Sequence, residues 1–129
     1  MYLTLLASAT ATNSPPTLAS DGVSLATSAI RGDRGLCLVQ STAGSGTMTV
    51  TIRLWGYSAV PAAWAPLGYG ADATKGVIND GAALGETGTN LIQHAELIDG
   101  LENFDRLYAE ITAIGGTSTA ISCYLAARI

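Results

Sequence analysis

Several segments of this chain alternate between apolar and polar residues with a period of two. In residues 47–55, TMTVTIRLW, every second residue is apolar, and the residues between them are three threonines and an arginine. Residues 104–114, FDRLYAEITAI, and 120–127, AISCYLAA, alternate in a similar way. Successive side chains of a β-strand point to opposite faces of its sheet, so this pattern predicts strands with one buried face.

Short segments that contain glycine join these strands. GGTST at 115–119 separates the last two alternating runs, and STAGSG at 41–46 separates RGLCLVQ from TMTVTIRLW. A short glycine-containing loop between two such runs is typical of a β-hairpin, and we expect one at each place. Weaker strand candidates lie at 23–30 and 90–98. Pro61, Pro66 and seven glycines from Gly56 to Gly88 indicate loops between them.

No long stretch keeps the 3.6-residue apolar period of an amphipathic helix. Several short strands with glycine-rich connections predict an all-β fold, either a β-sandwich or a jelly-roll-like barrel, over residues 21–129. The alternation also predicts which side chains form the core: Val50, Ile52, Leu107, Ile111, Ile121 and Leu125.

Residues 1–20, MYLTLLASATATNSPPTLAS, carry no charge. We expect them to form an extended N-terminal arm that packs on a neighbouring subunit, because Pro15 and Pro16 break the strand pattern and suit a linker. The competing interpretation is that the segment is the first strand of the sandwich itself. A secretory leader is not expected, since no basic residue precedes the short apolar run. The side chains assigned to the arm interface are Tyr2, Leu3, Leu5 and Leu6.

The composition favours a surface that another protein covers. Only 12% of the 129 residues are charged, about half the usual share, while 48% are hydrophobic and the mean hydropathy is +0.33. Six basic residues against ten acids give a net charge of −4, which argues against nucleic acid as a partner because phosphate binding needs clustered cations. No apolar run approaches the roughly 20 residues of a membrane span.

Residues that could do chemistry are few. His94 is the single histidine, so one chain has no multi-histidine metal site, and a small hydrolase would depend on this residue. Asp99, Glu102 and Asp105 could pair for acid-base work or bind calcium, but a solvated turn explains them equally well. We therefore expect no catalytic residue, no cofactor and no metal. Cys37 and Cys123 are expected to be buried, reduced thiols.

Four aromatic residues lie in the middle of the chain: Trp55, Tyr57, Trp64 and Tyr69. Large rings among small residues could anchor a protein partner or stack on sugars, and they could also be core packing at the end of a strand. We include them as candidate protein-interface residues. A carbohydrate-binding module is the alternative function that this group suggests.

Residues 99–128, DGLENFDRLYAEITAIGGTSTAISCYLAAR, and 44–57, GSGTMTVTIRLWGY, resemble the small β-sandwich proteins of tailed bacteriophage virions, especially capsid decoration (cement) proteins. The likeness spans most of residues 30–129, and what is shared is the alternation of apolar and polar residues together with the kind of loop between the strands. It implies a non-enzymatic protein on the outer capsid surface, assembled in the host cytoplasm, that binds the major capsid protein and stabilises contacts between its subunits, often as a homotrimer. A tail or neck component is the alternative within the same group.

Overall fold

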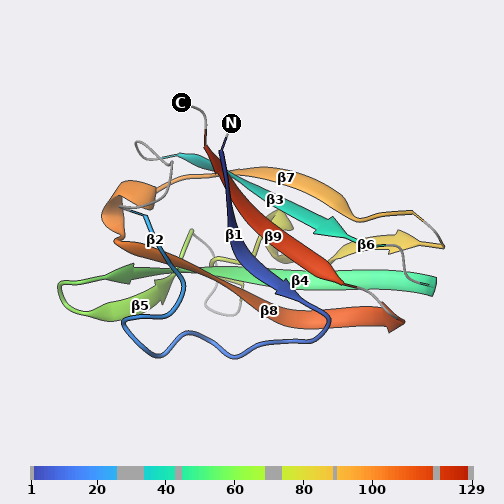
Figure 1. Cartoon of the computed structure of the whole chain (residues 1–129), viewed down its shortest axis with the longest axis horizontal. Helices are drawn as coiled ribbons and strands as arrows, with labels where there is room; N and C mark the ends of the chain where they lie inside the picture. The colour runs from blue at the N-terminus through green and yellow to red at the C-terminus, as the bar shows by residue number, and fades with distance from the viewer. Residues whose placement is uncertain are drawn as a thin grey trace.

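The computed structural model describes residues 2–25, 34–42, 45–68, 74–88, 90–117 and 120–127. These parts form β-strands and two short 3-10 helices (Figure 1), which confirms the predicted all-β, sandwich-like fold. The elements are β1 (Tyr2–Ala9), β2 (Val23–Ser24), β3 (Gly35–Ser41), β4 (Ser45–Ser58), β5 (Ala63–Pro66), η1 (Asn79–Gly81), β6 (Leu84–Thr87), β7 (Gln93–Ile98), η2 (Leu101–Asn103), β8 (Arg106–Thr117) and β9 (Ile121–Ala127).

The strands form two antiparallel sheets, named sheet A and sheet B below. Sheet A has the order β1-β9-β3-β7, and sheet B has the order β2-β8-β4-β5, with β6 also paired to β4. β5 and β6 share one side of the long strand β4, at Trp55–Ser58 and Thr47–Val50 respectively. Both lie in the region that the glycines and prolines led us to expect as loop, because strands of four residues are too short for alternation to show.

The apolar faces of the two sheets meet in a single core. All six side chains predicted for this core have at most 1% of their surface exposed. They are joined by Met48, Leu54, Cys37, Val39 and Cys123, each also at most 1% exposed. The alternating pattern therefore identified the inner faces of β4, β8 and β9 correctly.

The two predicted hairpins are wrong. β3 lies in sheet A and β4 in sheet B, and β8 and β9 are likewise in different sheets, so each glycine-containing connection crosses between sheets. The pairs that form are β4 with β8 and β3 with β9. Thr42, just after β3, and Ala120, just before β9, are in contact: the N–H of Thr42 donates to the carbonyl of Ala120 at 2.9 Å. Alternation fixes which face of a strand is buried, but it does not fix which strand lies beside it.

A β-bulge shifts the register of β8 against β4. Ile111 pairs with Ile52, but Ala113 pairs with Thr51, so Thr112 is the extra residue. Strict alternation would bury Ala113, whereas Ala113 is exposed and Ile114 packs against the core instead.

The expectation of an N-terminal arm on a neighbouring subunit is corrected by the structure, which shows the alternative. β1 is an edge strand of sheet A and pairs with β9 of the same chain from Tyr2–Ala127 to Ala9–Ile121. The prolines that suggested a linker follow this strand and lie in the crossing to sheet B. Of the two weaker strand candidates, the one at 90–98 contains β7, and the one at 23–30 contains the two-residue β2. Residues 26–30 of the second lie outside the described part.

Candidate functional site

The predicted interface residues lie on two opposite faces of the sandwich. Leu3 and Leu5 are exposed on β1 in sheet A, while Trp55, Tyr57 and Trp64 are half-buried on sheet B. Leu6 falls at the bulge of β1, between Leu5 and Ala7, and packs partly against the core. Tyr69 and the side chain of Tyr2 lie outside the described part of the structure.

The outer face of sheet A has three rows of side chains that cross its four strands. The strand register defines the rows, because residues opposite each other on neighbouring strands point to the same side. The first row is Leu3, Ala126, Leu36 and Leu97; the second is Leu5, Tyr124, Leu38 and Ala95; the third is Ser8, Ser122, Gln40 and Gln93. These twelve positions are called the leucine face below.

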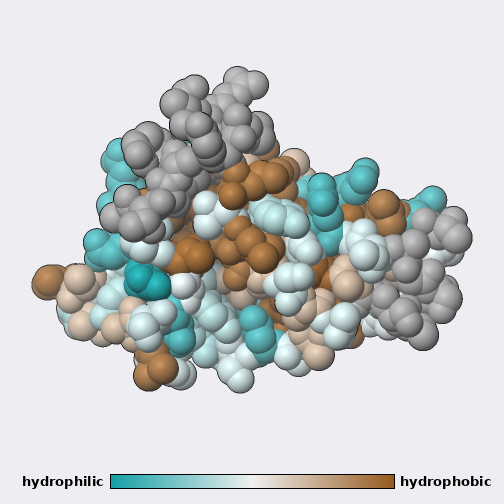
Figure 2. All heavy atoms as spheres, viewed as in Figure 1, coloured by the Kyte–Doolittle hydropathy of each residue, from teal (hydrophilic) through white to brown (hydrophobic). Residues whose placement is uncertain are grey.

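None of the twelve side chains of the leucine face is charged, and its first two rows are apolar except for one tyrosine hydroxyl. Leu3, Leu5 and Leu97 keep 57%, 50% and 55% of their surface exposed. Figure 2 shows hydrophobic side chains gathered over β1, β9 and β3 near the centre of the view. An exposed cluster of large apolar side chains on a soluble domain marks a contact surface.

Sequence reasoning found the β1 part of this face and missed the leucines of β3 and β7. A signal was present in GLCLVQ, where both alternating sets are apolar. Cys37 and Val39 point into the core, so Leu36 and Leu38 must point outward. A strand that is apolar on both sides indicates that its outer side is also covered.

The aromatic group lies on the outer face of sheet B, which we call the aromatic face: Trp55, Tyr57, Trp64 and Tyr108. The rings of Tyr57 and Trp64 have centroids 5.2 Å apart and planes tilted by 52°, and those of Trp64 and Tyr108 are 6.1 Å apart at 68°. The indole N–H of Trp55 donates to Oε1 of Glu110 at 2.9 Å. Rings tilted against one another do not present the single flat platform that stacking on a sugar requires.

The segment at residues 10–22, called the strap below, connects β1 to β2 and follows β8 (Figure 1). Asn13 acts like one residue of a strand, because its side-chain oxygen accepts from the N–H of Ile111 at 2.6 Å and its amide donates to the carbonyl of Ala109 at 3.2 Å. β2 then pairs with Leu107 and Arg106. The outer edge of β8 is thus protected from pairing with another chain.

The aromatic face holds the strap in place. The indole N–H of Trp64 donates to the carbonyl of Leu18 at 2.9 Å, and the hydroxyl of Tyr108 donates to the carbonyl of Ser14 at 2.8 Å. Arg106 donates to three further strap carbonyls, those of Ser20, Asp21 and Gly22, at 2.8–3.1 Å. The polar groups of three of the four rings are therefore already used within the chain: that of Trp55 by Glu110, and those of Trp64 and Tyr108 by the strap.

Two ionisable groups at the strap have shifted pKa values. Hydrogen bonds from the backbone N–H groups of Leu18 and Thr17 lower the pKa of Asp21. Burial, with the nearby carboxylates of Asp21 and Glu110, raises the pKa of Tyr108. Tyr108 therefore remains a neutral donor to the strap at all ordinary pH values.

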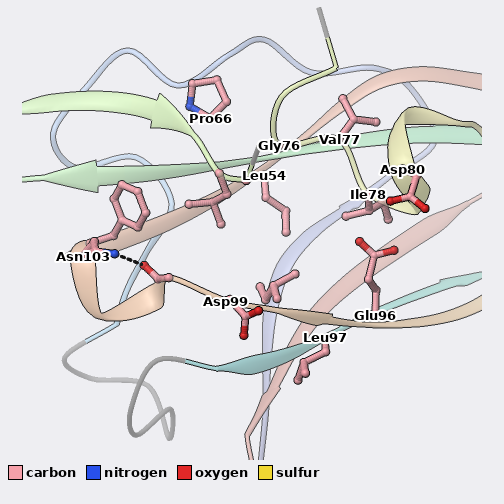
Figure 3. A pocket seen from close by; sticks show the side chains of 15 residues that line it. Leu54, Pro66, Gly76, Val77, Ile78, Asp80, Glu96, Leu97, Asp99 and Asn103 are labelled. Carbon is pink, nitrogen blue, oxygen red and sulfur yellow. Dashed lines mark hydrogen bonds between the residues drawn. The ribbon is translucent and has the colours of Figure 1, made fainter. Parts of the chain in front are cut away.

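An open pocket of about 430 Å³ lies between the ends of β4 and β5, the turn at 74–80, β7 and η2 (Figure 3). Its walls include Leu54, Ile78 and Phe104. In Figure 3 the side chain of Glu96 points toward Ile78, while Leu97 points away to the outer face. The Glu96 carboxylate accepts from the backbone N–H of Asn79 at 2.8 Å, so it fastens the turn to β7.

His94 lies beside this carboxylate. Its Nε2 is 3.0 Å from Oε1 of Glu96, and both side chains are about a quarter to a third exposed. The described contact thus joins the imidazole to an acid and brings no hydroxyl or thiol nucleophile to it. Of the three acids considered above, Asp99 forms an exposed ion pair with Arg34 at 3.0 Å, and Asp105 accepts from the N–H of Ala59 at 2.8 Å.

Cys37 and Cys123 are both fully buried and free, with their sulfur atoms 3.7 Å apart. They lie on the neighbouring strands β3 and β9, on the core side. The hydrogen bond with Cys37 and burial raise the pKa of the Cys123 thiol well above its ordinary value. The expectation of two buried free thiols is confirmed.

Within the described ranges, no three His, Cys, Asp or Glu side chains gather into a group that could hold a metal ion. No helix in those ranges has the length and apolar character needed to cross a membrane. Comparison with known proteins finds no matching family model, no matching curated protein and no matching solved structure. The features of the described residues that bear on function are therefore the two outer surfaces of the sandwich.

Proposed function

We propose that this protein is a non-enzymatic structural component of a tailed-phage virion, and that it binds the outside of the capsid as a decoration protein. In this role it contacts the major capsid protein and stabilises the contacts between capsid subunits. The observation that carries the proposal is the leucine face, an uncharged and largely apolar sheet surface on a chain with few charges elsewhere.

The exposed apolar area of the leucine face favours association, because covering it removes apolar surface from water. Burying a large aliphatic side chain is worth about 1.5–3 kcal/mol relative to leaving it in water. Three leucines of this face are at least half exposed, so covering them supplies several kilocalories per mole to an assembly. A structural component of a shell is held in place when a neighbour covers such a face.

The aromatic face supports the proposal in a second way. Trp55, Tyr57 and Trp64 are half-buried on the opposite side of the sandwich, so the part of these rings that the strap leaves exposed is a second candidate contact surface. A component that bridges neighbours in a shell needs at least two such surfaces. The resemblance to capsid decoration proteins adds the major capsid protein as partner and the virion surface as location. The resemblance also implies a homotrimer, which is the alternative to the two-fold pair inferred below, and the mass of the associated species distinguishes the two.

Purified virions of the phage whose genome encodes the chain test the proposal. We expect the protein in gradient-purified particles by mass spectrometry, and on their outer surface by labelling with an antibody. Added to shells that lack it, the purified protein should bind at saturable sites and raise the temperature at which the shells break. Virions that contain no copy of the protein, or shells that it neither binds nor stabilises, refute the proposal. Detection in isolated tails alone identifies a tail component instead.

A further inference from the structure

We infer that the leucine face is covered by a second copy of this chain, packed sheet against sheet about a two-fold axis. The inference deepens the proposed function and rests on it, because it names the partner of the surface that carries that proposal. The capsid contact then falls to other surfaces of the pair, the aromatic face among them.

Charge is the first argument for a second copy. The chain has a net charge of −4, so two copies that meet through charged surfaces repel each other. The leucine face has no charge at any of its twelve positions, and the exposed ion pair of Arg34 with Asp99 flanks it just beyond the ends of β3 and β7. A partner for this face must itself be uncharged and apolar where it touches, and the same face of another copy meets that requirement.

The order of the rows is the second argument. A two-fold axis that runs between two stacked sheets, parallel to the strands, places β9 of one copy over β3 of the other and each row over its equivalent. The two apolar rows then meet apolar rows, and the row of serines and glutamines meets its own hydrogen-bonding groups. Stacked sheets lie about 10 Å apart, which lets such side chains interdigitate. Tyr124 and Leu38, at the middle of the face, lie nearest this axis.

The size of the face sets the strength of the contact. Four strands about 4.8 Å apart and six residues at about 3.3 Å give a face of roughly 400 Å². A standard stable interface buries about 800 Å² on each partner, so this pair belongs to the weak, concentration-dependent class. We expect a dissociation constant in the range of about 10–500 μM in solution. A shell that holds many copies close together would favour the paired state without any new contact.

Sedimentation velocity of the purified chain, from about 5 to 500 μM, tests the inference. The wild type should show a reversible monomer–dimer equilibrium. Leu38→Glu places two like charges near the axis and should weaken the dimer by at least about tenfold. Thr51→Glu, which puts the same charge on a central strand of sheet B, is the matched control and should change the dissociation constant by less than about twofold.

Mixing charge variants separates a direct contact from a general loss of stability. Leu38→Glu and Leu38→Lys should each be largely monomeric, and an equimolar mixture should associate at least about fivefold more tightly than either variant alone. Leu97→Glu, on the edge strand β7, is a second variant whose fold is less at risk because Leu97 is already 55% exposed. It should also weaken the dimer, and circular dichroism should show that every variant remains folded.

Three results would overturn the inference. They are a wild type that stays monomeric throughout, a species with the mass of three chains, and a Leu38→Glu variant that dimerises as well as the wild type. A monomer that nevertheless binds shells would show that the capsid protein covers the leucine face, so the inference fails and the proposed function stands. If the chain dimerises through the leucine face but no virion contains it, the inference stands and the proposed function fails.

Discussion

Gly56 lies on the inner face of β4, where the ring of Phe104 packs directly against its backbone. A Cβ atom added at Gly56 would lie 2.4 Å from two ring carbons of Phe104 and 2.7 Å from a third. Carbon atoms in ordinary contact are about 3.5–4.0 Å apart, so the ring would have to withdraw by about 1 Å. Phe104 follows η2, is partly buried against the core and also lines the open pocket, so relief of this contact requires the whole ring to shift out of its place on the core.

The change Gly56→Ala should therefore destabilise the fold. The clash outweighs the small gain in stability that alanine gives by lowering the conformational entropy of the unfolded chain. Overpacking a well-filled site by one methyl group typically costs about 1–3 kcal/mol. With a urea dependence of about 2 kcal/mol per molar, the midpoint of unfolding should fall by about 1 M. Gly85→Ala is the matched control, since its Cβ would meet its nearest neighbour at 3.4 Å, and it should leave the midpoint within about 0.2 M of the wild type.

A second variant tests whether Phe104 is the cause. In a Phe104→Leu background the ring is gone, and the cost of Gly56→Ala should fall to less than about half its value in the wild type. Equilibrium urea unfolding, followed by circular dichroism for all four chains, gives these differences. A Gly56→Ala chain as stable as the wild type, or equal costs in the two backgrounds, would refute the reasoning.

Three further outcomes are expected. Thiol titration of the denatured protein without reductant should find both Cys37 and Cys123 free, and in the folded protein both should react at least about a hundredfold more slowly because they are fully buried; a denatured chain without free thiol would contradict this. Arg106→Met removes the donors to three strap carbonyls, so limited proteolysis should cut the strap while the core stays intact; an uncut strap would show that the other contacts suffice. NMR titration of Asp21 should give a pKa below its ordinary value of about 3.9, because the N–H of Leu18 stabilises the ionised form. The unfolded chain then binds the proton first as the pH falls, so this contribution to stability is present above about pH 4 and is lost as the pH falls through the folded pKa; an unshifted pKa would contradict the hydrogen bonds.

The sequence predicted the burial of the sandwich better than its connections. Val50, Ile52 and Leu107 could be assigned to the core because a period of two relates each side chain to its own strand. Strand pairing depends on segments far apart in the chain, and alternation has no information about them. The β3–β4 and β8–β9 connections therefore looked like hairpins, although each carries the chain to the opposite sheet.

The contact surfaces were predictable only where their side chains stood out locally. Leu3 and Leu5 were noticed because they lie in an uncharged N-terminal segment, and they do lie on the leucine face. Leu97 lies between Glu96 and Ile98 in QHAELID, where neither alternating set of residues is uniformly apolar, so nothing in the local pattern marks it as part of an apolar outer face. Its place beside Leu36 follows from the register of β3 with β7, which the sequence alone does not contain.

The position of β9 has a consequence for the order in which this chain can fold during synthesis. β9 follows all the other described strands in the chain, yet it lies between β1 and β3 in sheet A. β4 and β5 can pair as soon as residues 59–62 have formed their turn, but β1 and β3 are each paired with β9, so their places in sheet A are joined only when β9 arrives between them. Pairing of such distant segments is slow, and unpaired strands are prone to aggregate. Sheet A therefore stays open during synthesis until β9 emerges, and the edges of β1 and β3 depend on this late strand for their protection from misassembly.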